Sequence, residues 1–223
     1  MRKFLEFGGL VAAVVLVAFG IGAIVIGVDG RDTVRHSLGL EQIVGTPDMT
    51  PSAIAAEARK AGLTGVELPT TAVAGEKIDT GAKARAFAGY MRIHALEATG
   101  GYVYAQMGQY QAKPGTPRSE LSPGGGTSNV QYAQLDPQTR QPVANGARNV
   151  WVTETALTTA LNTSYMAEQT ALFGIVVGIA LLLAGIGFGI LAFGGALRNP
   201  ETAIASLRKR QPSIRHKAPI SAA

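Results

Sequence analysis

The sequence predicts a mainly α-helical membrane protein, with a hairpin of two transmembrane helices and a mostly helical extracytoplasmic domain containing short strands and a Pro/Gly-rich loop. Two long runs contain no charged residue, and the basic residues are concentrated at the chain ends. The expected order follows from these observations. Along the chain we expect a cytoplasmic N-terminus (1–6), a first span (7–28), an extracytoplasmic domain (29–170), a second span (171–197) and a basic cytoplasmic tail (198–223).

The second uncharged run, residues 171–197, is long enough to cross a bilayer. As a helix it extends about 40 Å at a rise of about 1.5 Å per residue, whereas the hydrocarbon core is about 30 Å thick. Backbone N–H and C=O groups must be paired within such a span, which predicts a helix. Residues 150–173 contain no Pro or Gly. We therefore expect one helix over about 150–196, in which residues 150–170 form a stalk.

The first uncharged run follows Arg2 and Lys3, a beginning that a cleavable signal peptide shares. The run is longer than the apolar region of a typical signal peptide. No small-x-small cleavage site precedes the charges at Asp29, Arg31 and Asp32. We therefore expect an uncleaved transmembrane helix over residues 7–28.

The distribution of charge predicts the orientation in the cell membrane. Residues 1–28 and 171–223 together hold eight basic and two acidic residues, so the total net charge of +5 leaves −1 for the middle of the chain. Short basic segments stay in the cytoplasm, which places both termini there. In the tail, Arg208, Lys209 and Arg210 are candidate contacts for lipid headgroups. This charge comes without a nucleic-acid-binding fold, so no nucleic-acid partner is expected.

Local signals in the central domain predict two helices. Thr50 and Pro51 are suited to the start of a helix that ends near Gly62. A second helix is expected over about 81–98, after a cap at Asp79-Thr80.

Extended pieces and loops are expected elsewhere in the domain. Short strands are predicted within 66–78, 102–104 and 131–135. Residues 112–148 are rich in Pro and Gly and are expected to be loop-rich, with the triple glycine at 124–126 as a linker. Farther along, we expect Trp151 to pack within the domain and Tyr165 to lie at the membrane interface.

Small residues recur at four-residue spacing in both spans. The pairs are Gly174 and Gly178, Gly185 and Gly189, Ala18 and Gly22, and Ala23 and Gly27. Such pairs allow helix backbones to approach closely. The pattern favours packing of the two spans within one chain, with an interface between chains as the alternative.

The sequence carries little catalytic chemistry. It has no cysteine, nucleophile elbow, HExxH motif or phosphate-binding loop, so no catalytic, cofactor or metal site is predicted. His94, with Glu97 one turn later, is half of a metal or acid–base pair at most, since no second histidine lies at ligand spacing. Neither span contains an ionisable residue, which argues against a transporter acting alone.

Two segments, IVGTPDMTPSAIAAEARKAG and NGARNVWVTETALTTALNTSYMAEQ, resemble those of uncharacterised actinobacterial membrane proteins. The resemblance covers about residues 30–190. It implies the two-span layout with an extracytoplasmic domain and no particular activity.

The leading hypothesis is an interaction or structural protein, or an accessory subunit of a membrane or envelope assembly. Its expected partners are the lipid bilayer and either another membrane or envelope protein or further copies of the chain. One alternative is an envelope hydrolase that uses Glu97, His94 or Asp79, from the helix at residues 80–98 and its start. Another is an oligomeric transport component, although neither span contains Ser or Thr to line a pore.

Overall fold

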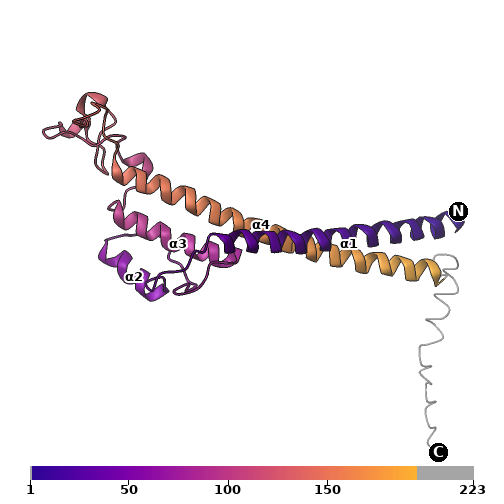
Figure 1. Cartoon of the computed structure of the whole chain (residues 1–223). Coiled ribbons are helices and arrows are strands. Elements are labelled where there is room, and N and C mark those ends of the chain that lie inside the picture. Colours follow the sequence, from indigo (N-terminus) through magenta and orange to yellow (C-terminus); the bar gives the residue numbers. More distant parts are fainter. Residues whose placement is uncertain (1, 195–223) are drawn as a thin grey trace, which may run out of the picture. The chain divides into compact units, whose positions relative to one another are not determined.

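A computed structural model describes residues 2–194 and shows a mainly helical chain (Figure 1). The α-helices are α1 (Arg2–Leu40), α2 (Pro51–Lys60), α3 (Gly81–Ala98) and α4 (Gly146–Phe193). The described part of the chain divides into two compact units: one comprises residues 2–28 and 173–194, and the other comprises Asp29–Leu172. The predicted lipid contacts Arg208, Lys209 and Arg210 lie outside the described residues.

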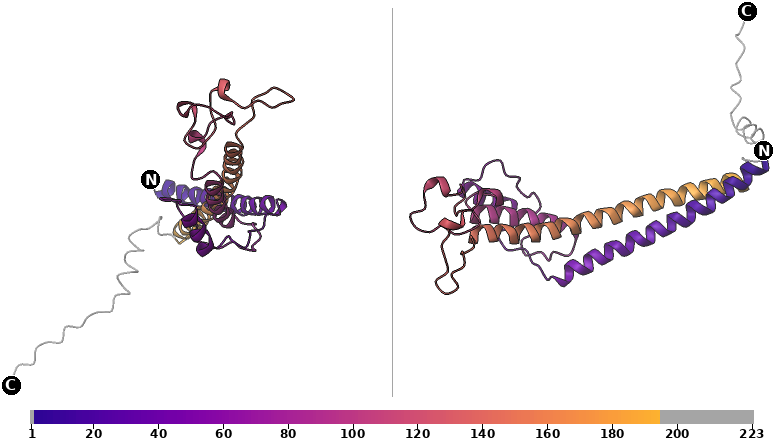
Figure 2. Two further views of the ribbon diagram at one scale, coloured as in Figure 1. Left: turned by 90° about the vertical axis from the view of Figure 1, so that its left-hand side faces the viewer. Right: turned by 90° about the horizontal axis from the view of Figure 1, so that it is seen from above.

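The first unit consists of two antiparallel helical segments, from α1 and α4, that run side by side (Figure 2). Both helices are long and apolar enough to cross a membrane. Large apolar side chains, among them Phe19, Ile26 and Leu183, are exposed on the outside of this unit. Such a continuous apolar exterior suits a hydrocarbon solvent better than water.

Buried small residues line the contact between these two segments. They are Ala13, Gly20 and Gly27 on α1, and Gly178, Gly185 and Ala192 on α4. Their seven-residue spacing keeps the same face of each helix turned toward its partner over several turns. The absence of bulky side chains at these positions lets the two backbones approach closely.

The core of the second unit lies where α2, α3 and parts of α1 and α4 meet. Tyr90 and Ile93 of α3 are almost fully buried, as is Ile54 of α2. Leu38 of α1 and Leu161 of α4 belong to the same apolar cluster. The core is therefore assembled from segments that are far apart in the sequence.

Both predicted domain helices are confirmed, with the expected caps. The Thr50 side chain accepts a hydrogen bond from the Ala53 N–H at 3.3 Å. The Thr80 side chain accepts one from the Lys83 N–H at the same distance. These hydroxyls satisfy N–H groups that have no partner within the first helical turn.

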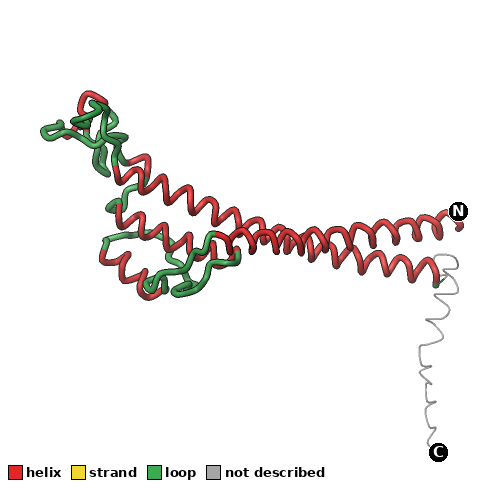
Figure 3. Tube along the Cα trace, in the orientation of Figure 1, coloured by secondary structure: helices red, strands yellow, loops and turns green. Residues whose placement is uncertain are grey.

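The prediction of short strands is wrong for the part of the chain that the structure describes. Helices and loops account for residues 2–194, and only isolated bridges such as Gly45↔Ala74 and Ala112↔Ala133 occur (Figure 3). Two of the predicted strands partly overlap 3₁₀ turns, at Tyr104–Gln106 and Val130–Tyr132. β-Branched and aromatic residues favour strands only where pairing with a neighbour continues over several residues, and these segments pair through isolated bridges at most.

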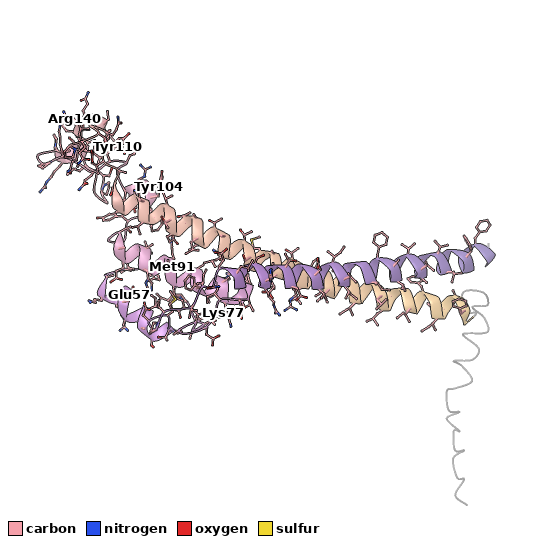
Figure 4. The ribbon with its side chains drawn as sticks, viewed as in Figure 1. Glu57, Lys77, Met91, Tyr104, Tyr110 and Arg140 are labelled. Atoms are coloured by element: carbon pink, nitrogen blue, oxygen red, sulfur yellow. The ribbon has the colours of Figure 1, made fainter. Side chains whose placement is uncertain are left out.

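The Pro/Gly-rich segment is loop-rich as predicted, but its triple glycine is not a linker. A Cβ atom at Gly126 would lie 2.6 Å from the Tyr110 carbonyl oxygen and from Asn145 Nδ2. The backbone of Gly126 also has a φ of +75°, a conformation that glycine adopts most easily. Figure 4 labels Tyr110 and Arg140 within this loop-rich part of the chain, which lies between α3 and α4 and is called the lobe below.

The predicted long helix is present as α4 and begins at Gly146, a few residues earlier than expected. The Asn145 side chain accepts a hydrogen bond from the Ala147 N–H at 3.2 Å, which explains this start. The expected end near residue 196 lies outside the described residues. Trp151 is buried with Ala95 and Leu96 of α3, as predicted for a residue that packs within the domain.

Candidate functional site

The glycines predicted to pack on α4 face α1 within the first unit. A Cβ atom at Gly178 would lie 2.7 Å from the Gly20 carbonyl oxygen, and one at Gly185 would lie 3.0 Å from that of Ala13. Cβ atoms at Gly174 and Gly189 would also meet α1, at ordinary contact distances of 3.8 and 3.9 Å. Gly178 and Gly185 are therefore the positions at which any side chain would push the helices apart.

The positions proposed on α1 need correction. Ala18 is exposed, and a Cβ atom at Gly22 would meet nothing within 4 Å. Gly20 occupies the close contact instead, because a Cβ there would lie 2.8 Å from the Gly178 carbonyl oxygen. The four-residue rule missed this position, since the contact between these helices repeats every seven residues.

In the second unit, the buried carboxylate of Glu168 joins three helices. Its Oε2 accepts a hydrogen bond from the Gly81 N–H at 2.6 Å, at the first residue of α3. Its Oε1 lies 3.1 Å from Arg35 Nε and 3.4 Å from Arg31 Nη2, both on α1. A carboxylate at the beginning of α3 is favoured by the positive end of the helix dipole.

A second buried carboxylate, Glu154, lies farther toward the start of α4. Its Oε2 is 3.3 Å from Arg92 Nη1, and its residue is only 3 % exposed. The Arg92 guanidinium also covers the Trp151 ring at 3.9 Å from the ring centroid. Arg92 is thereby held by an ion pair and by an aromatic face at once.

A groove of about 760 Å³ runs along α3 and α4 beside residues 67–71. Arg85 and Arg92 of α3 lie in its wall, and the Arg85 guanidinium covers the Tyr165 ring at 4.8 Å. Tyr165, predicted to lie at the membrane interface, is thus part of the groove. Its other polar lining residues are Glu67, Thr70, Thr71, Glu154, Thr158 and Asn162.

A separate cluster of ligand-type side chains gathers around His94 of α3. His94 Nε2 lies 3.3 Å from Oδ2 of Asp48, in the turn before α2. The ligand atoms of Asp48, Glu57 and His94 all lie within 4.8 Å of one another. In Figure 4, Glu57 on α2 and Met91 on α3 are labelled on the adjacent helices.

Charge and burial perturb the carboxyl groups of this cluster in opposite directions. Burial raises the pKa of Glu57, and a hydrogen bond with Glu97 raises it further. A hydrogen bond from Thr46 lowers the pKa of Asp48, with a smaller contribution from His94. The cluster therefore places three carboxyl groups and one imidazole close together.

Asp79 does not belong to this cluster. Its carboxylate lies 3.2 Å from Lys83 Nζ, and the hydrogen bond from Lys83 lowers the pKa of Asp79. It precedes the first turn of α3, whereas His94 lies about 20 Å farther along the helix at about 1.5 Å per residue. The hydrolase hypothesis therefore keeps His94 and Glu97 as possible partners and loses Asp79.

The sequence reasoning missed Asp48, Glu57, Glu154 and Glu168. Glu154 and Glu168 had a readable signal, because they lie seven residues on either side of the buried Leu161 and so share the apolar face of α4. A charged residue on an apolar helical face indicates a specific partner. Asp48 and Glu57 had no such signal, since only the tertiary fold brings them to His94.

No family model, curated protein or solved structure matches this chain. The class of protein supported so far is a mainly helical one with two helices that could span a membrane. The resemblance to actinobacterial two-span proteins stays a prediction.

Proposed function

We propose that this chain is a membrane-anchored interaction protein, an accessory subunit of a membrane or envelope assembly. The unit formed by Asp29–Leu172 faces the outside of the cytoplasmic membrane, and both termini lie in the cytoplasm. Two apolar helices and basic chain ends support this orientation.

The groove along α3 and α4 is the observation on which the proposed function depends. Arg85 and Arg92 lie seven residues apart on α3, about 10 Å along the axis at about 1.5 Å per residue. Tyr165 and Trp151 restrict these two side chains, so less conformational entropy is lost on binding. Arginine and aromatic residues are also enriched among the residues that dominate binding energy.

The occupant that this groove fits is an extended polypeptide segment of a partner protein with acidic side chains. Residues i and i+3 of an extended segment in the polyproline II conformation share one face and are about 9 Å apart, close to the separation of the two arginines. Guanidinium groups bind carboxylates through two parallel hydrogen bonds. Arg85 offers such a group, because its partner in the structure is an aromatic ring.

Photo-cross-linking in native membranes tests this function. A photoreactive amino acid replaces Asn162, which lines the groove, or Gln138 in the exposed turn of the lobe as a control. We expect one defined protein adduct from position 162 and none from 138. Arg85→Glu should reduce the adduct on the order of tenfold, as for a hot-spot residue, whereas Arg59→Glu on exposed α2 should not. The absence of an adduct, or equal loss with both variants, would contradict the proposal.

Cysteine labelling tests the orientation separately, because the chain contains no native cysteine. Thr139→Cys should react with a membrane-impermeant maleimide in intact cells. Ser213→Cys, in the tail, should react only after the membrane is permeabilised. The reverse pattern would overturn the orientation without bearing on the groove.

A further inference from the structure

We propose that Asp48, Glu57 and His94 bind one divalent transition-metal ion of the Zn²⁺ type. The site joins the turn before α2, α2 itself and α3 within the Asp29–Leu172 unit. This inference does not depend on the partner groove, because none of the three residues lines it.

The distances among the three ligand atoms are those of a coordination sphere. Zn²⁺ binds nitrogen and oxygen ligands at about 2.1 Å, so two ligands at a tetrahedral angle are about 3.4 Å apart. His94 Nε2 and Asp48 Oδ2 are separated by 3.3 Å. All three ligand atoms lie within 4.8 Å of one another, so small side-chain rotations would close the third position.

Unsatisfied polar atoms point to a missing cation at the same place. His94 Nε2 and Glu57 Oε1 are both inaccessible to solvent and have no hydrogen-bond partner among the described residues. The Nε2 atom is near Asp48 Oδ2, but the contact does not have hydrogen-bond geometry. Buried polar atoms without partners are costly, and a metal ion would satisfy both.

Electrostatics favour a dication over a monocation or no ion. Asp48, Glu57 and the neighbouring Glu97 carry up to three negative charges, and His94 is the only basic group among those that perturb Glu57. The mutual repulsion of these carboxylates is relieved when an ion with two positive charges lies between them. An imidazole with two carboxylates suits Zn²⁺ and its neighbours, whereas Ca²⁺ and Mg²⁺ prefer oxygen ligands alone.

Three protein ligands leave a fourth tetrahedral position for water or for Glu97, which already interacts with Glu57. The metal would tie α2 and the turn before it to α3. We therefore expect Zn²⁺ to stabilise the folded chain, since it binds the assembled site and not the separated ligands.

Calorimetric titration of ZnCl₂ into the full-length protein tests the site. The protein is purified in detergent without a histidine tag, stripped with a chelator and dialysed. We expect one ion per chain, a rise in the thermal unfolding midpoint, and a visible absorption band when Co²⁺ replaces Zn²⁺. His94→Gln and Asp48→Asn should each weaken binding by about tenfold or more and abolish the rise.

Matched variants distinguish the loss of a metal ligand from a general loss of folded structure. His36→Gln, on an exposed position of α1, and Glu67→Gln, on an exposed loop, should bind Zn²⁺ like the natural chain. Circular dichroism checks that each ligand variant is folded, and Glu57→Gln provides a third, independent ligand change. Absence of binding in the natural chain at millimolar Zn²⁺ would overturn the proposal, as would unchanged binding in both folded His94→Gln and Glu57→Gln.

Discussion

The Oε2 atom of Glu168 accepts a hydrogen bond from the Gly81 N–H at 2.6 Å, across 87 residues of sequence. The two residues belong to α4 and α3, and Glu168 also pairs with Arg31 and Arg35 of α1. One buried carboxylate thus accepts the first N–H of α3 and pairs with two guanidinium groups. Glu168 therefore connects α1, α3 and α4 within the Asp29–Leu172 unit.

Replacement of Glu168 should destabilise this unit. Glu168→Gln keeps the size of the side chain but removes the charge that faces Arg31 and Arg35, at an expected cost of about 1–3 kcal/mol. Chemical unfolding in detergent, followed by circular dichroism, measures the free energy of unfolding. The control is Glu67→Gln, whose residue is exposed. Equal stability of the two variants would show that the Glu168 contacts contribute little.

Gly81 should not tolerate even a methyl group. A Cβ atom at this position would lie 2.8 Å from Glu168 Oε2 and from the Tyr165 Cα atom. We expect Gly81→Ala to lower the free energy of unfolding by about 1–3 kcal/mol, the usual cost of overpacking. Gly39→Ala should be neutral or stabilising, because a Cβ there meets nothing within 4 Å. The same unfolding assay compares the two variants, and a harmless Gly81→Ala would count against the contact.

An engineered disulfide should link the two long apolar helices, α1 and α4. A Cβ atom at Gly189 would lie 3.9 Å from that of Ala13, within the range of about 3.5–4.5 Å found in disulfides. Ala13→Cys with Gly189→Cys should therefore oxidise within one chain, detected as a mobility shift of the monomer in non-reducing gels. Ala18→Cys with Gly189→Cys is the matched pair on the exposed face. A dimer band from the first pair would instead support packing between chains.

Loss of Arg92 should leave a buried charge without a partner. Arg92→Ala removes the ion pair with Glu154 and the contact with Trp151, and we expect a loss of about 1–3 kcal/mol in unfolding free energy, because the Arg92 side chain is itself 46 % exposed. Arg92→Met with Glu154→Leu removes both charges and should recover much of this loss. Thermal and chemical unfolding measure the stability of the single and the double variant. If the double variant is as unstable as Arg92→Ala, the desolvated charge is not the cause.

Asp136 should titrate at a pH below that of a free aspartate. Hydrogen bonds from the Thr139 backbone and side chain, and from the Gln138 N–H, lower the pKa of Asp136 from its ordinary value of 3.8. Since the folded-state pKa is depressed, its stabilising effect on the turn is present above pH 3.8 and is lost as the pH falls through the folded value. Carboxyl NMR shifts measure this titration. Thr139→Val should move the pKa back toward 3.8, and an unchanged value would refute this cause.

The starts of α2 and α3 were predictable because their signals are local. Thr50 with Pro51 and Thr80 act within a single turn, and each caps the predicted helix. The two apolar runs were equally clear, since a long uncharged helix is a property of consecutive residues. Strand propensity was misleading at 131–135, because Ala133 and Leu135 form only isolated bridges, and local sequence does not show whether such pairing continues.

The sequence by itself determined the helical character of the chain, the two apolar helices and the glycines available for close packing. Only the tertiary structure decided that Gly20, rather than Gly22, faces Gly178, and that Asp48 and Glu57 meet His94. The physical reason is the distance along the sequence over which each kind of interaction acts. Capping and hydropathy act over a few residues, whereas the contacts of Glu168 and of the His94 cluster arise only when distant segments bury a common core.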